Sequence, residues 1–177
     1  MNLVLIIFQG CLVVYLLALL WFLLGLFRPE PPQTDEQPMV SVVVAARNGD
    51  PVLSRLLGQL QAQDYPSSRL EIIIVDDGLA ERSRTVLEEA AENDGRLKVV
   101  ESYSGDQQLS YKKRALDAGI HHSRGEILLF TDVDCQVGRG WVRSMVSYFT
   151  PAIDYVVGWS QVAPRSGFTL GDDAAGS

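Results

Sequence analysis

Ile127-Leu128-Leu129-Phe130-Thr131-Asp132-Val133-Asp134 decides the fold, because an apolar run there passes directly into two spaced carboxylates. In an extended backbone, side chains at positions i and i+2 point to the same side. Asp132 and Asp134 therefore converge, while Val133 turns towards the core. Two convergent carboxylates repel each other unless a cation lies between them, and hard oxygen ligands suit Mg²⁺ or Mn²⁺. The stretch predicts a buried strand that ends at a divalent-metal site.

A second strand of the same kind ends in an acidic pair. The run Glu71-Ile72-Ile73-Ile74-Val75 is followed by Asp76 and Asp77. A nearly continuous apolar run of β-branched residues is typical of a strand buried on both faces. Two acidic strand ends in one small domain indicate a site that handles a nucleotide and its metal.

Strands and helices alternate along the chain. This pattern predicts an α/β fold, a doubly wound and mostly parallel sheet with helices on both faces. Ligands of such sheets bind at the carboxyl ends of the strands. Ser110 is expected to cap the third helix. The expected strands are 40–46, 70–75, 97–100, 126–130 and 153–157. One expected helix begins at 50 and ends before 66. The other expected helices span 80–92, 110–121 and 140–149.

The N-terminal segment is apolar and carries no charged residue from Asn2 to Phe27. A membrane-spanning helix needs about 20 such residues. A cleaved signal peptide would need a basic start, a shorter apolar stretch and a small-residue cleavage site. We therefore predict one retained transmembrane anchor over 1–28 and a stiff, proline-rich linker over 29–38. The basic residues of the following domain favour its cytoplasmic location.

Composition and short motifs exclude several classes of protein. The net charge of −7 argues against nucleic acid as a partner. Cys11 and Cys135 form no plausible disulfide, which fits a reducing compartment. The adjacent His121 and His122 are expected at a helix end, outside any metal site. Neither a G-x-G-x-x-G loop nor a P-loop is present, so phosphate charge must be met by a metal and by basic side chains.

Segments in four places, in order, resemble the family 2 glycosyltransferases, which have the GT-A (Rossmann-like) fold. The segments are Val42–Asn48, Ile74–Gly78, Tyr111–Ile120 and Leu129–Asp134. The third segment is similar to the family pattern GKKAALNAGI. The resemblance extends over about 40–161. It implies an inverting, metal-dependent transfer of a sugar from a nucleoside-diphosphate sugar.

The resemblance also implies roles for single residues in the nucleotide site. Asp76 would contact the nucleobase or ribose, with Asp77 as its neighbour in that pocket. Ala45 and Arg47 would line the nucleotide. Lys112 would face the nucleotide or its phosphates.

The metal site follows from the same resemblance. Asp134 would bind Mg²⁺ or Mn²⁺ on the diphosphate, and Asp132 would contact the ribose or the metal. The cation would stabilise the leaving diphosphate as a Lewis acid and as a template.

No residue of this chain is recognisable as the general base that an inverting transfer needs. In the family this carboxylate lies further downstream. Asp172 and Asp173 are acidic, but nothing in the sequence positions them. We expect a donor-binding domain over 39–162 and a disordered tail over 163–177. The acceptor half would come from a missing C-terminal part or a partner subunit.

The expected function is therefore that of a membrane-anchored glycosyltransferase acting on a lipid-linked or envelope glycan acceptor. The alternative is a catalytically incomplete protein that binds a nucleotide sugar, or a partner, without turnover. A nucleotidyltransferase is a third hypothesis. Such enzymes usually have a basic, glycine-rich first loop, which Ala45-Ala46-Arg47-Asn48 does not supply.

Overall fold

The computed structural model describes residues 2–27, 33–47 and 50–160. The chain divides into two compact units, 1–32 and 33–177. The predicted tail over 163–177, with Asp172 and Asp173, lies outside the described residues.

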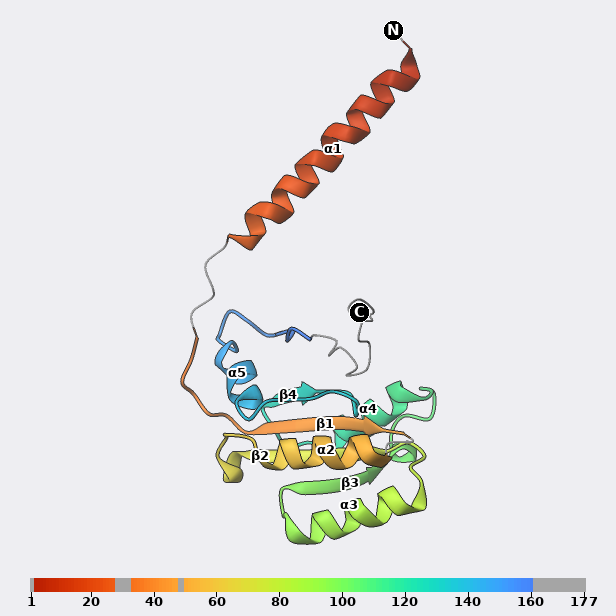
Figure 1. The fold of residues 1–177 in the computed structure, drawn as a ribbon, viewed down its shortest axis with the longest axis vertical. Coiled ribbons are helices and arrows are strands. Elements are labelled where there is room, and N and C mark those ends of the chain that lie inside the picture. Colours follow the sequence, from red (N-terminus) through yellow and green to blue (C-terminus); the bar gives the residue numbers. More distant parts are fainter. Residues whose placement is uncertain (1, 28–32, 48–49, 161–177) are drawn as a thin grey trace, which may run out of the picture. The chain divides into compact units, whose positions relative to one another are not determined.

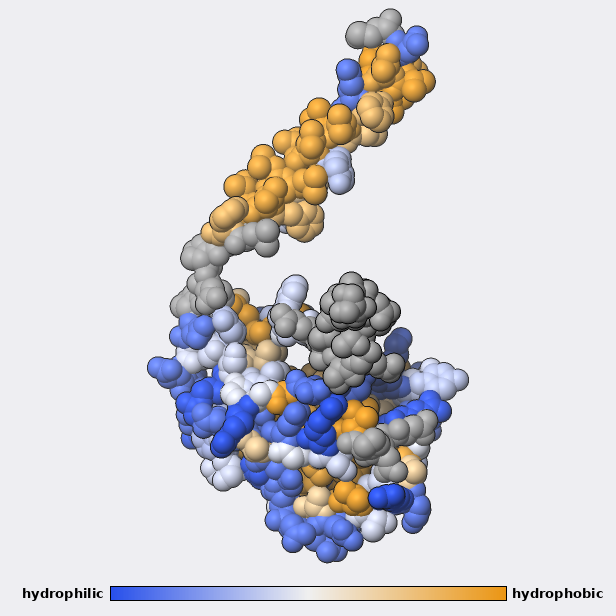
Figure 2. All heavy atoms as spheres, in the orientation of Figure 1, coloured by the Kyte–Doolittle hydropathy of each residue, from blue (hydrophilic) through white to orange (hydrophobic). Residues whose placement is uncertain are grey.

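The first unit contains a single described helix, α1 (Leu3–Leu26), which carries no charged residue. At about 1.5 Å per residue, its 24 residues span about 36 Å. Figure 2 shows apolar residues along its whole length. By length and composition, Leu3–Gly25 is able to cross a membrane.

The second unit is built on a parallel sheet of four strands (Figure 1). The strands are β1 (Val40–Ala46), β2 (Leu70–Asp76), β3 (Leu97–Glu101) and β4 (Ile127–Phe130). Their order is β3-β2-β1-β4, and all neighbours run parallel. The chain therefore moves outward in one direction from β1 to β3 and then crosses to the other side of β1. The carboxyl ends of β1 and β4 lie beside this switch in strand order, where open α/β sheets bind ligands.

Helices cover both faces of the sheet. They are α2 (Asp50–Gln61), α3 (Glu81–Asn93), α4 (Lys112–His121) and α5 (Trp141–Ser147), with short 3₁₀ turns η1 (Ser67–Arg69) and η2 (Ser102–Ser104). One core cluster joins alternate residues of β1, such as Val42 and Val44, to α2, α3 and α5. The opposite face, with Val43, packs on Ala115 and Ala118 of α4. This two-sided burial confirms the predicted α/β fold and explains why β1 and β2 read as continuous apolar runs.

The segment before β1 is tied to the second unit. The backbone N–H of Thr34 donates to the carbonyl of Ser147 at 2.7 Å. The hydroxyl of Tyr65 donates to the carbonyl of Pro38 at 2.7 Å. Thus the described part of the expected linker, residues 33–38, has contacts that hold it against the domain.

Two local predictions are wrong. Ile153–Val157 is not a strand: Thr150 and Ile153 form an isolated antiparallel bridge, and the described chain beyond it has no regular structure. A strand needs a ladder partner, and the described residues after Ile153 have none. Ser110 does not cap α4, because the helix begins at Lys112 with Tyr111 in the capping position and no side-chain cap.

Candidate functional site

The carboxyl ends of the parallel strands bring the predicted residues to one edge of the sheet. Ala46 of β1 pairs in register with Asp76 of β2, and Val43 pairs with Phe130, the last residue of β4. Because β4 ends before β1 does, the acidic segment after Phe130 runs on beside the free end of β1. Helix α4 begins at the same edge.

A pocket of about 390 Å³ opens at this edge. It brings together six of the predicted residues and two others that the sequence did not single out as pocket residues. Its lining consists of Ala45, Arg47, Asp77, Tyr111, Lys112, Asp132, Val133 and Asp134. Asp76 is the predicted site residue that does not line it.

The carboxylate of Asp76 is buried and organises the turn after β2. It accepts hydrogen bonds from the backbone N–H groups of Gly78 at 2.9 Å and Leu79 at 2.8 Å. The guanidinium of Arg84 also donates to it, at 2.8 and 3.0 Å, and this nearby negative charge raises the pKa of Arg84. Gly78 has a φ of 100°, which glycine adopts without strain. Asp76 thus shapes the turn, and its neighbour Asp77 faces the pocket.

Removing the Asp76 carboxylate is expected to destabilise the second unit. Asp76→Ala leaves two N–H groups without their acceptor, which costs about 2–4 kcal/mol in the free energy of unfolding. Asp76→Asn keeps one acceptor oxygen for those N–H groups and loses mainly the pair with the partly exposed Arg84, so it is expected to cost less than Asp76→Ala. Urea unfolding of the two variants measures the difference. Equal losses would contradict this division of roles.

The metal-binding prediction concerns the two carboxylates after β4. Asp132 forms an ion pair with Lys112, with 2.5 Å between Oδ1 and Nζ, and both side chains are more than half exposed. Within the described residues, Asp134 makes no hydrogen bond or ion pair. Among these residues no group of three or more His, Cys, Asp or Glu side chains gathers as a closed metal cage. Two open carboxylates fit Mg²⁺ or Mn²⁺, which keep several positions for water and substrate phosphates.

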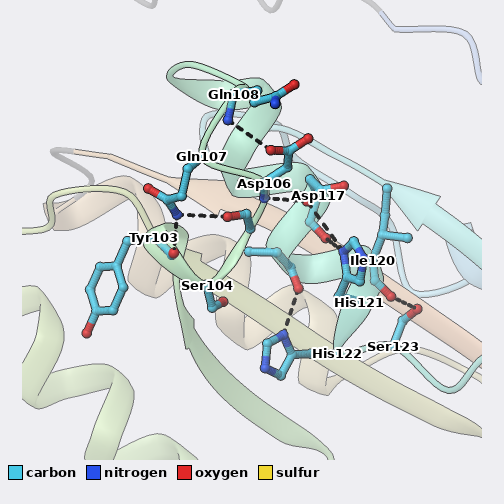
Figure 3. A network of polar contacts seen from close by, with 12 residues as sticks. Tyr103, Ser104, Asp106, Gln107, Gln108, Asp117, Ile120, His121, His122 and Ser123 are labelled. Atoms are coloured by element: carbon cyan, nitrogen blue, oxygen red, sulfur yellow. Dashed lines mark hydrogen bonds and ion pairs between the residues drawn. The ribbon is translucent and has the colours of Figure 1, made fainter.

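The segment that leads into the pocket is fastened to α4 (Figure 3). The carboxylate of Asp117 accepts from the backbone N–H of Asp106 at 2.8 Å, and the Asp106 carboxylate accepts from the N–H of Gln108 at 2.8 Å. These bonds hold the chain just before Tyr111 and Lys112 against the side of the helix. The start of α4 is thereby fixed at the pocket.

The adjacent histidines lie at the opposite end of α4. His121 Nδ1 is 2.9 Å from the carbonyl oxygen of Asp117, and His122 Nδ1 is 2.8 Å from that of Ala118. Their place at the end of α4 confirms the predicted helix-end position.

A buried ionic cluster that the sequence analysis did not predict lies at the amino ends of the strands, opposite the pocket. Glu71 in β2 is 1% exposed. Its carboxylate accepts from the Ser41 hydroxyl at 2.6 Å, the Lys98 ammonium at 2.7 Å and the Arg124 backbone N–H at 2.5 Å. The signal was a single acidic residue inside an otherwise apolar strand, because a buried carboxylate requires partners. The cluster joins β1, β2, β3 and the segment before β4.

This cluster changes the titration of Glu71. Burial by itself raises the pKa of the carboxyl group. The hydrogen bonds from Lys98, Ser41 and the Arg124 backbone outweigh it and lower the pKa from 4.5 to about 2. Glu71 is therefore ionised at every physiological pH and acts as a fixed tie between strands.

Comparison with known proteins identifies relatives of this fold and site. The family model described as Glycosyl transferase family 2 matches residues 41–171. A β-monoglucosyldiacylglycerol synthase of Synechocystis sp. is 33% identical over 116 residues, which are 66% of this chain and 24% of that protein. An N-acetylglucosaminyltransferase of Rhizobium meliloti is 31% identical over 150 residues, which are 79% of this chain and 32% of that protein.

Solved structures agree with these relatives. The mannosyltransferase PcManGT of Pyrobaculum calidifontis, in complex with GDP-Man and Mn²⁺, has a TM-score of 0.55 and 29% identity. The match covers 72% of this chain and 36% of that one. The likeness of this chain to that structure confirms the predicted GT-A fold. This chain spans about a quarter of the length of the first curated relatives that it matches.

Proposed function

Because this chain belongs to glycosyl transferase family 2, we propose that its pocket binds a nucleoside-diphosphate sugar and that the whole protein transfers the sugar, with inversion, to a lipid-linked or envelope glycan acceptor. The observation that carries the proposal is the convergence of Asp77, Lys112, Asp132 and Asp134 on one pocket at the switch in strand order.

The residues around the pocket suggest how the donor lies. We assign Asp77 to the polar edge of the nucleobase or to the ribose, with Ala45 and Arg47 along the nucleotide. Asp76 supports Asp77 through the turn. The family resemblance implies a direct contact between Asp76 and the nucleobase or ribose, and this contact stays a prediction. The Asp76 carboxylate already accepts hydrogen bonds from Gly78, Leu79 and Arg84.

The phosphate end of the donor belongs to Lys112 and the two carboxylates after β4. Asp134 and Asp132 would hold Mg²⁺ or Mn²⁺, which stabilises the diphosphate leaving group as a Lewis acid when bound. The Lys112 ammonium neutralises Asp132 in the structure. If a cation were bound by the carboxylates, the Lys112 ammonium would be free to interact with the phosphates. A relative solved in complex with GDP-Man and Mn²⁺ supports the presence of a divalent cation together with the nucleotide sugar.

The membrane supplies the acceptor in this proposal. Helix α1 anchors the chain, and the second unit lies on the cytoplasmic side, where nucleotide sugars are made. A lipid acceptor is supported by the similarity to a β-monoglucosyldiacylglycerol synthase. The acceptor hydroxyl would attack the anomeric carbon as its bond to the diphosphate breaks, and a general base outside the described pocket would take the proton.

Calorimetric titration tests the proposal. The full chain in detergent is titrated with UDP, GDP and dTDP, each with and without Mn²⁺. We expect one of the nucleotides to bind and its binding to require the metal. Failure of all three to bind would contradict the proposed function. Binding of a nucleotide without any sugar transfer would favour the alternative of a nucleotide-sugar-binding protein without turnover.

A further inference from the structure

Tyr111 has a backbone conformation that aromatic residues avoid. Its φ of 51° and ψ of −134° lie in a region that essentially only glycine occupies. It is the only non-glycine residue of the described part of the chain with a positive φ. In the family pattern GKKAALNAGI a glycine stands at this position. The protein therefore places a bulky ring where a side chain is energetically unfavourable.

The surroundings hold Tyr111 in place without burying its ring. Its carbonyl accepts the first bond of α4, from the N–H of Ala115 at 3.2 Å. On the other side, the bond from Asp106 to Asp117 fastens the preceding segment to the helix (Figure 3). The Tyr111 side chain makes no capping hydrogen bond and is 70% exposed. Core packing therefore does not account for an aromatic residue here.

The position of Tyr111 at the pocket suggests a binding role for its ring. Tyr111 is the only aromatic residue among the described residues that line it, and it adjoins Lys112 in the chain. A nucleoside diphosphate has a charged end and a flat aromatic base. Lys112 and the carboxylates after β4 serve the charged end. The base requires an apolar face, which Tyr111 offers, and a polar partner for its edge, which Asp77 offers.

We propose that Tyr111 is the nucleobase platform of the donor site: its ring stacks on the base while the Asp77 carboxylate accepts a hydrogen bond from the edge of the base. This inference rests on the proposed function and adds a binding residue that determines selectivity for the nucleotide. It also gives the strained conformation a role, because the unfavourable φ aims the ring at the ligand instead of the core.

The test separates contacts to the base from contacts to the phosphates. The full chain in detergent, with Mn²⁺, is titrated with the tightest-binding of UDP, GDP and dTDP and, separately, with inorganic pyrophosphate. Tyr111→Ala is expected to weaken nucleotide binding about 5- to 100-fold, the range for loss of one stacked base, and to leave pyrophosphate affinity unchanged. Tyr111→Phe keeps the ring and is expected to bind within about twofold of the parent.

Two further variants guard against a folding artefact. Tyr103→Ala removes an aromatic ring that is 66% exposed and lies outside the pocket, and it is expected to change neither affinity. Tyr111→Gly relieves the backbone, so it is expected to melt no lower than Tyr111→Ala while binding the nucleotide just as weakly.

The outcomes are distinct. Unchanged nucleotide affinity in Tyr111→Ala, or an equal loss for pyrophosphate, would overturn the role of Tyr111 and leave the proposed function standing. A parent chain that binds none of the nucleotides would overturn the proposed function itself.

Discussion

Asp134→Ala is expected to abolish the metal-dependent part of nucleotide binding. Asp134 lies in the pocket with an open, exposed carboxylate that makes no hydrogen bond or ion pair among the described residues. Loss of a residue that only orients a metal ligand already lowers metal affinity about 10- to 100-fold, so loss of a direct ligand should lower it more than about 100-fold. Titration with Mn²⁺ and the best-binding nucleotide measures the loss.

The control for this variant is Asp154→Ala. Asp154 is an exposed carboxylate outside the pocket, and its removal changes the net charge by the same amount. Asp154→Ala is expected to leave the affinities for Mn²⁺ and for the nucleotide unchanged. Chelation of the metal should lower the nucleotide affinity of the parent to that of Asp134→Ala. An unchanged metal-dependent affinity in Asp134→Ala would exclude this residue as a ligand.

Glu71→Gln is expected to lower the free energy of unfolding strongly. The depression of the Glu71 pKa from 4.5 to about 2 corresponds to about 3 kcal/mol of stability at neutral pH. The amide keeps the shape of the side chain but leaves the ammonium of Lys98 without its charged partner. Urea unfolding of the full chain in detergent, followed by circular dichroism, measures the difference.

The pH dependence of that difference is a sharper test. Because the folded-state pKa lies below the unfolded one, the ionised carboxylate stabilises the fold above about pH 4.5. This stabilisation falls away as the pH drops towards about 2. The stabilities of the parent and Glu71→Gln should therefore converge over that range. Glu88→Gln, at an exposed position of α3, should have the same stability as the parent at every pH in this range. A constant gap from pH 7 to pH 2 would contradict the assignment.

The two central strands, β1 and β2, were predictable because they are buried on both faces. Apolar runs such as Val40–Ala46 have no alternation to misread, and their acidic ends mark where each strand stops. Pattern alone misplaced a strand at Ile153–Val157, since an apolar run forms a strand only where a neighbouring ladder accepts it. Long-range pairing of this kind is not encoded in a local segment.

The site was predictable to the level of the strand ends and less so at the level of single atoms. Asp132 and Asp134 both line the pocket, but not as alternating strand residues, because β4 ends at Phe130 and the chain turns at Val133 and Asp134. The division between Asp76, which binds its own turn, and Asp77, which lines the pocket, depends on the position of Arg84 eight residues later. Tyr111 enters the pocket through a backbone conformation that residue preferences disfavour.

A crystal structure of the protein with Mn²⁺ and its best-binding nucleoside diphosphate would locate the metal and the donor. We expect one anomalous manganese peak at Asp134 and Asp132, with the diphosphate on the metal, Lys112 turned from Asp132 to the phosphates, and the base in the pocket beside Asp77. Manganese bound away from these carboxylates, or a nucleotide outside this pocket, would contradict it.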